Sequence, residues 1–114
     1  MSRRTFLSPY RIMWVFVMFD LPVGTKKERK QATGFRNELL NLGFEMSQFS
    51  VYQKYCSSTE KAETVDGQIQ NLLPPGGKVD ILTVTDRQFG NMRRFYARKD
   101  TGKNAGKPGQ LHLF

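Results

Sequence analysis

The sequence has one cysteine, Cys56, and one histidine, His112, among its 114 residues. A disulfide within the chain is therefore excluded, and so is a zinc site built from clustered cysteine and histidine side chains. A Ser/His/Asp or Cys/His catalytic constellation is not expected either, because the single imidazole lies beside the C-terminus. With one cysteine and no pairing partner, we expect a reduced, cytoplasmic setting.

Long hydrophobic runs are also absent. The apolar run from Ile12 to Phe19 is far shorter than the roughly 20 residues that span a bilayer. The arginines before it resemble the charged start of a secretory signal, but Asp20 and Pro22 interrupt that pattern. We interpret the run as a buried strand and expect no membrane partner.

Positive charge exceeds negative charge, since 18 Lys and Arg residues against 10 Asp and Glu residues leave a net charge of +8. The bases concentrate in residues 1–43 and 87–114, on either side of an acidic segment at 44–86. This distribution suits a polyanion such as nucleic acid, because each Lys or Arg placed on a phosphate releases condensed counterions. A generally basic soluble protein is the alternative interpretation.

The first part of the sequence predicts a strand followed by a helix. The apolar run at 12–19 is typical of a central strand that is covered on both faces. Thr25 and Glu28 then form a capping-box pattern, which predicts that a helix begins there. Apolar residues recur along it at intervals of three and four, and Gly43 marks its end. They are Ala32, Phe35, Leu39 and Leu42.

The second part repeats this order. Residues 44–55 alternate in polarity and predict a strand or a bent pair of strands. The motif SSTE at 57–60 predicts a second capping box, opening a helix that continues until Pro74-Pro75. Residues 78–85 predict another strand, 87–92 a short helical turn and 93–98 a brief strand.

Two successive strand, helix, strand units predict an α+β fold, namely a ferredoxin-like βαββαβ sandwich with both helices on one face. At this length the chain is expected to form one domain, which we assign to residues 1–98. Residues 99–114 are expected to form a flexible basic connector and an extra C-terminal strand segment. The sheet face without helices is expected to be covered by a second copy, giving a two-fold homodimer.

Asp20 is the carboxylate that stands out, because it ends the apolar run where the chain is expected to surface. Mg²⁺ often binds only one or two protein carboxylates and keeps several waters, so one Asp per chain suffices if a two-fold axis joins two copies. The competing interpretation is structural: Asp20 caps a turn before Pro22 and the start of the helix.

Two basic clusters are candidates for nucleic-acid binding. Lys26, Lys27, Arg29 and Lys30 lie in the first turn of the expected helix, where backbone amides already favour an anion. Arg93 and Arg94 belong to a second cluster near the end of the domain. Both clusters could equally be solvated surface. Tyr52 and Phe49 could stack on the bases of single-stranded RNA, which would make the chain a non-enzymatic RNA-binding module; core or interface packing is the alternative.

Three segments in this order resemble a known family: FVMFDLP at 16–22, GFEMSQFSVYQKY at 43–55 and ILTVTDRQFGNM at 81–92. It is the small CRISPR-associated endonuclease family, the second of the two spacer-acquisition proteins, in the form found with type II systems. The likeness covers about residues 12–96 and extends to LHLF at the C-terminus. It implies a ferredoxin-like protomer and a homodimer in which two Asp20 carboxylates face each other. It also implies that the C-terminal segment pairs with the partner subunit or docks on the integrase.

The resemblance implies two functions. In one, the protein is a Mg²⁺- or Mn²⁺-dependent nuclease in which Asp20 holds the metal beside the scissile phosphate. In the other, the homodimer holds double-stranded pre-spacer DNA between subunits of the CRISPR integrase, which performs the strand transfer. Two departures from the family pattern favour the bridging role. Phe19 stands where the family often has tyrosine, and Met46 lies where some proposed nucleases have an arginine.

Overall fold

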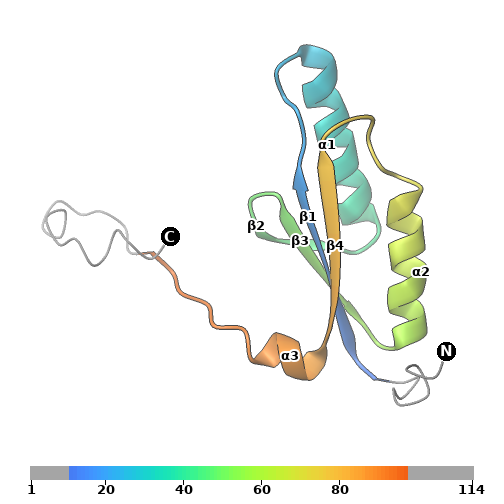
Figure 1. The fold of residues 1–114 in the computed structure, drawn as a ribbon, viewed down its shortest axis with the longest axis vertical. Coiled ribbons are helices and arrows are strands. Elements are labelled where there is room, and N and C mark those ends of the chain that lie inside the picture. Colours follow the sequence, from blue (N-terminus) through green and yellow to red (C-terminus); the bar gives the residue numbers. More distant parts are fainter. Residues whose placement is uncertain (1–10, 98–114) are drawn as a thin grey trace, which may run out of the picture.

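Seven elements follow one another between residues 11 and 97, the part of the chain that the computed structural model describes (Figure 1). In order they are β1 (Met13–Asp20), α1 (Lys26–Asn41), β2 (Glu45–Gln48), β3 (Val51–Cys56), α2 (Thr59–Gln70), β4 (Lys78–Thr85) and α3 (Asp86–Gly90). The four strands form one antiparallel sheet in the order β2-β3-β1-β4. The predicted α+β fold and its βαββαβ order are therefore confirmed.

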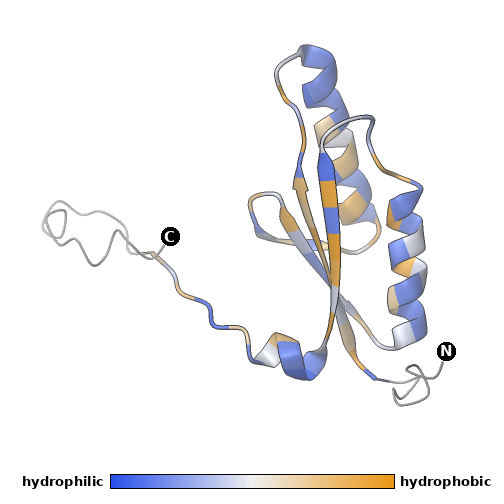
Figure 2. Cartoon of the chain, in the orientation of Figure 1, coloured by the Kyte–Doolittle hydropathy of each residue, from blue (hydrophilic) through white to orange (hydrophobic). Residues whose placement is uncertain are grey.

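One face of the sheet is covered by α1 and α2 (Figure 1). The residues of β1 that face the helices are Met13, Val15, Val17 and Phe19, and all four are buried. They pack against buried side chains of α1 (Phe35 and Leu39) and of α2 (Ala62, Val65 and Ile69). In Figure 2 α1 is mainly hydrophilic with a few hydrophobic bands, as expected when a helix buries one narrow stripe.

Both long helices begin at hydroxyl caps, but the second begins one residue later than predicted. Thr25 accepts a hydrogen bond from the Glu28 amide, and Glu28 accepts one from the Thr25 amide, which confirms the first capping box. The second cap is Ser58, whose hydroxyl accepts from the Lys61 amide at 3.1 Å. The predicted box at 57–60 is therefore wrong, because a lysine occupies the third helical position and cannot accept a bond in return.

The alternating stretch 44–55 folds as a hairpin, the bent pair of strands that its pattern allowed. Ser50 occupies the turn with φ of 64°, and its carbonyl accepts a hydrogen bond from the Phe19 amide at 3.1 Å. That bond ties the hairpin turn to the last residues of β1. The turn is therefore held beside Asp20.

The second face of the sheet is partly covered by α3. The Phe89 ring stacks on Trp14, with 3.8 Å between ring centroids, and the Trp14 indole donates to the Asp86 carboxylate at 2.8 Å. This covers the end of the sheet where β1 begins. The end where β1 finishes has no such cover from residues 11–97, so the open face of the sheet is smaller than the sequence predicted.

Downstream of α3 the structure differs from the predicted strand. Residues 92–97 follow the short helix without forming a strand, so the brief strand expected at 93–98 is wrong over its described part. The predicted connector and C-terminal strand at 99–114 lie outside the described residues, as does the basic segment before Arg11. None of the helices between residues 11 and 97 is long and apolar enough to cross a membrane.

Candidate functional site

Asp20 is the last residue of β1 and is exposed, so the chain surfaces at this carboxylate as predicted. Strand alternation puts it on the open face, opposite to the helices, and the register pairs it with Lys78 of β4. No residue between 11 and 97 forms a hydrogen bond with its side chain, and the cap of α1 is Thr25. The interpretation of Asp20 as a turn or helix cap is therefore wrong within the described chain.

A second carboxylate lies beside Asp20. Asp80 is two residues along β4 from Lys78, on the same open face, and its carboxylate is 3.6 Å from the Lys78 ammonium. All three polar residues lie at one open depression of about 340 Å³, which is lined by Met18, Phe19, Asp20, Phe49, Ser50, Val51, Lys78 and Asp80. Sequence reasoning missed Lys78 and Asp80 because their proximity to Asp20 depends on the β1–β4 register.

Phe49 forms one edge of this depression at the tip of the β2–β3 hairpin. Its side chain is 85% exposed. The hydrogen bond from the Phe19 amide to the Ser50 carbonyl holds the turn in place. An aromatic ring is thus presented to solvent next to an acidic and a basic side chain, an arrangement suited to a base and its phosphate.

Gly77 packs against the backbone of Asp20. A Cβ at this position would lie 2.7 Å from the Asp20 carbonyl oxygen, and Gly77 has φ of +81°. Only glycine meets both conditions without strain. The turn that brings β4 beside β1 therefore depends on glycine at this position.

The first predicted basic cluster lies at the same end of the sheet as Asp20 (Figure 1). Lys26, Lys27, Arg29 and Lys30 are all exposed in the first turns of α1. The Arg29 guanidinium donates to the Val23 carbonyl at 3.1 Å, so it also braces the loop after β1. This cluster and the carboxylate therefore share one end of the molecule.

The second basic cluster belongs to the segment after α3. Arg93 and Arg94 follow α3, which begins where the Asp86 amide donates to the carbonyl of Ile12, just before β1. Arg94 donates to the Ser47 hydroxyl at 3.3 Å, and Arg93 lies over the Phe95 ring at 5.2 Å. Arg94 therefore contacts β2 two residues before Phe49, and no described hydrogen bond or ion pair links either arginine to Asp20.

The predicted role of Tyr52 in stacking on RNA bases is wrong. Its side chain is 3% exposed and stacks on Phe19 within the helix-covered core, so it cannot stack on a base. Phe19 also points into that core, toward Phe35 and away from Asp20. A tyrosine at position 19 would therefore place its hydroxyl on the core face of β1 and not on the face that carries the Asp20 carboxylate.

The number of acidic side chains near Asp20 limits the kind of metal site that one chain can form. Among the described residues there is no group of three His, Cys, Asp or Glu side chains that could hold a metal ion. Asp20 and Asp80 supply oxygen ligands of the kind that Mg²⁺ and Mn²⁺ prefer, and Mg²⁺ commonly takes only one or two protein carboxylates. The residues present thus fit a water-rich divalent cation site but not a cage made by one chain.

Comparison with known proteins decides the family. Residues 13–92 match the family model described as CRISPR associated protein Cas2. The chain belongs to the Cas2 family. A relative from Paracidovorax avenae, named CRISPR-associated endoribonuclease Cas2, is 50% identical over 108 residues, covering 95% of this chain and 99% of the relative. A Flavobacterium psychrophilum protein of the same name is 48% identical, covering 96% of this chain and 95% of the relative.

A solved structure supports the fold of this Cas2 family member. The match, entitled "Crystal structure of cas2", has a TM-score of 0.54 and covers 79% of this chain and 91% of that chain. At 17% identity it shows the fold alone. The family resemblance expected from the three sequence segments is thus confirmed, while the roles of individual residues stay predictions.

Proposed function

We propose that this chain acts in CRISPR adaptation as a homodimer that binds double-stranded pre-spacer DNA and bridges integrase subunits. The observation that carries the proposal is the group of exposed bases in the first turns of α1, beside a sheet face that the helices leave open. Membership of the Cas2 family supports the adaptation role. We also propose that the protein is the form of this family found with type II CRISPR systems.

The open face supports the homodimer. Leu82 and Tyr55 lie on it with about half of each side chain exposed, next to the partly exposed Trp14 and Met18. Contiguous apolar surface of this kind is characteristic of an interface between copies. A two-fold axis through this face would bring two Asp20 carboxylates toward each other.

Nuclease activity at Asp20 is the second part of the proposal. The relatives are named endoribonucleases, which makes RNA a candidate substrate alongside DNA. A divalent cation held by Asp20 would polarise a phosphodiester and lower the pKa of a bound water. The chain itself would supply Lys78 to hold a phosphate and Phe49 to orient the neighbouring base.

DNA binding is assigned to the exposed bases of α1. Lys26, Lys27, Arg29 and Lys30 offer charge for phosphates, and no element of the described fold is shaped to read base edges. Binding should therefore depend on salt and be nearly independent of sequence. Affinity that changes sharply with sequence would contradict this part of the proposal.

The decisive experiment is pre-spacer integration by the cognate integrase with wild-type protein, with Asp20→Ala, and with the protein omitted. We expect omission to abolish integration and a folded, dimeric Asp20→Ala protein to support it, which identifies a bridge. A folded mutant that fails as omission does would instead make metal chemistry at Asp20 essential. Integration that proceeds without the protein would refute the proposed function.

The dimer has its own test, because Leu82 has an equally exposed counterpart outside the open face. Leu82 lies on the open face and Leu73 lies in the segment after α2, and each is 50% exposed. We expect Leu82→Asp to convert the dimer to a folded monomer in light scattering and Leu73→Asp to leave it dimeric. Dimers of unchanged stability in both variants would place the interface elsewhere.

A further inference from the structure

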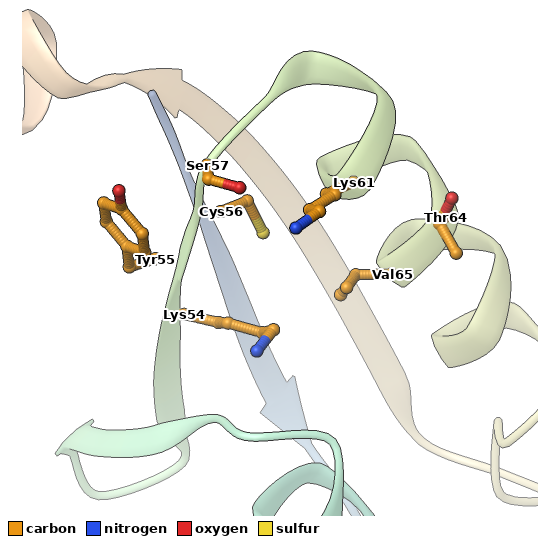
Figure 3. A pocket seen from close by; sticks show the side chains of 7 residues that line it. All are labelled: Lys54, Tyr55, Cys56, Ser57, Lys61, Thr64 and Val65. Atoms are coloured by element: carbon orange, nitrogen blue, oxygen red, sulfur yellow. The ribbon is translucent and has the colours of Figure 1, made fainter. Parts of the chain in front are cut away.

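A second hollow lies on the opposite face of the sheet from Asp20, near the other end of the strands. It has a volume of about 360 Å³ and lies between the end of β3 and the first half of α2 (Figure 3). The pairing of Cys56 with Met13, the first residue of β1, puts it at the far end of that strand from Asp20. Its walls are formed by Lys54, Tyr55, Cys56, Ser57, Lys61, Thr64 and Val65.

Two lysine amines enter this hollow from different elements. Lys54 comes from β3 and Lys61 from α2, and both side chains point into the same space in front of the Cys56 thiol (Figure 3). Both ammonium groups act electrostatically on that thiol: burial raises its pKa, and the two lysines partly counter the effect. Two like charges therefore converge on one small, partly apolar space.

The Lys54 amine lies close to the main chain at Gly43. A Cβ on Gly43, just past the end of α1, would lie 2.6 Å from the Lys54 amine nitrogen. Gly43 has φ of +96°, so glycine here both ends the helix and leaves room for the amine. The lysine is thus packed against the main chain and does not simply extend into solvent.

Neither amine is neutralised by a carboxylate in the described chain. Over residues 11–97 the one ion pair within 4.0 Å joins Lys78 and Asp80, which lie on the other face of the sheet. Two ammonium groups at one small hollow repel each other, and an anion between them removes that repulsion. Ser57 adds a hydroxyl at the same hollow, and hydroxyls commonly donate to phosphate oxygens.

We propose that the hollow between Lys54 and Lys61 is a binding site for a phosphate group, separate from the Asp20 site. Its volume exceeds that of one phosphate, and Val65 gives it an apolar wall, so the bound group belongs to a larger molecule or is accompanied by water. Two sources share this chemistry: a free phosphate or phosphomonoester, and a phosphate of a nucleic-acid backbone. The inference does not depend on chemistry at Asp20.

The test is an NMR titration of the full-length protein with inorganic phosphate at constant ionic strength. We expect saturable shifts of the backbone amides of Ser57 and Lys61, with chloride in place of phosphate giving none. Lys61→Gln and Lys54→Gln should each weaken binding about fivefold, equivalent to roughly 1 kcal/mol. Arg87→Gln, which removes a charge from α3, is the matched control and should change the affinity less than about twofold.

A second titration with duplex DNA distinguishes the sources. If DNA shifts the same amides and competes with inorganic phosphate, the site takes a backbone phosphate; if it leaves them unmoved, the ligand is a free phosphate or phosphomonoester. The single cysteine adds an independent readout, because phosphate in the hollow should slow alkylation of Cys56 in wild type but not in Lys61→Gln. Shifts that never saturate, or equal affinity in the double lysine variant, would overturn the proposal.

Discussion

Asp20 and Lys78 lie directly opposite each other at the last pair of the β1–β4 ladder, on the open face of the sheet. The Lys78 ammonium is also 3.6 Å from the Asp80 carboxylate. Lys78 is therefore paired with Asp20 by the strand register and with Asp80 by its side chain, in a depression that is also lined by Phe49. A phosphate that approaches Asp20 meets a positive charge already held in place.

Lys78→Gln should weaken nucleic-acid binding while leaving the fold intact. Both members of the Lys78–Asp80 pair are mostly exposed, so its loss should cost less than about 1 kcal/mol of unfolding free energy. Removing one phosphate contact should reduce the slope of log affinity against log salt by about one. Fluorescence anisotropy across a salt series measures this slope.

The control for Lys78 is Arg87→Gln, which removes the same charge from α3 at the other end of β4. We expect it to lower affinity only slightly and to leave the salt slope close to that of wild type. Equal slopes for the two variants would show that Lys78 contributes only to net charge.

Gly77→Ala should destabilise the protein by at least about 2 kcal/mol, because the new Cβ meets the Asp20 carbonyl at 2.7 Å and φ is +81°. Gly34→Ala is the matched change within α1, where a Cβ would have no neighbour within 4 Å. It should stabilise by about 0.5–1 kcal/mol. Urea denaturation of both variants at one protein concentration checks the pair, and a neutral Gly77→Ala would contradict the close approach.

Alanine substitutions at two adjacent serines test where α2 begins. Ser58→Ala removes the hydroxyl that accepts from the Lys61 amide and should cost about 1 kcal/mol of unfolding free energy. Ser57→Ala leaves that cap intact and should change stability by much less. The reverse order in thermal denaturation would restore the capping box predicted from the sequence.

Stability should fall at alkaline pH through Cys56. Burial raises the pKa of its thiol in the folded state, with Lys54 and Lys61 opposing the change. The folded chain thus holds this proton more tightly than the unfolded chain. The stability that the protonated Cys56 thiol contributes is complete below the pKa of about 8.5 of the unfolded chain. It is lost as pH rises through the higher pKa of the folded chain.

Urea denaturation of wild type and Cys56→Ala between neutral and alkaline pH isolates the contribution of the Cys56 thiol to the unfolding free energy. Other groups titrate equally in both proteins, so their effects cancel in the difference. We expect the unfolding free energy of wild type to decline more steeply with pH than that of the variant. Parallel curves would mean that the thiol is not buried in solution.

Much of the fold could be predicted because its local signals agree. The 3,4 spacing of Ala32, Phe35 and Leu39 predicted the buried stripe of α1, and the three residues are buried. The Thr25 cap could also be predicted, because its capping box involves only Thr25 and Glu28. Ser58 was missed by one residue because SSTE offers two adjacent serines, and only packing of the helix stripe selects between them.

The candidate site was only half predictable. Local polarity was enough to predict that Asp20 ends a buried strand and that bases follow in the next helix, since each feature belongs to one short segment. Three other features followed from the folded chain alone: Tyr52 is in the core, Asp80 and Lys78 lie near Asp20, and Lys54 and Lys61 line one hollow. These outcomes depend on strand register and on which face each strand turns to the helices, and a shift of one residue would reverse them all.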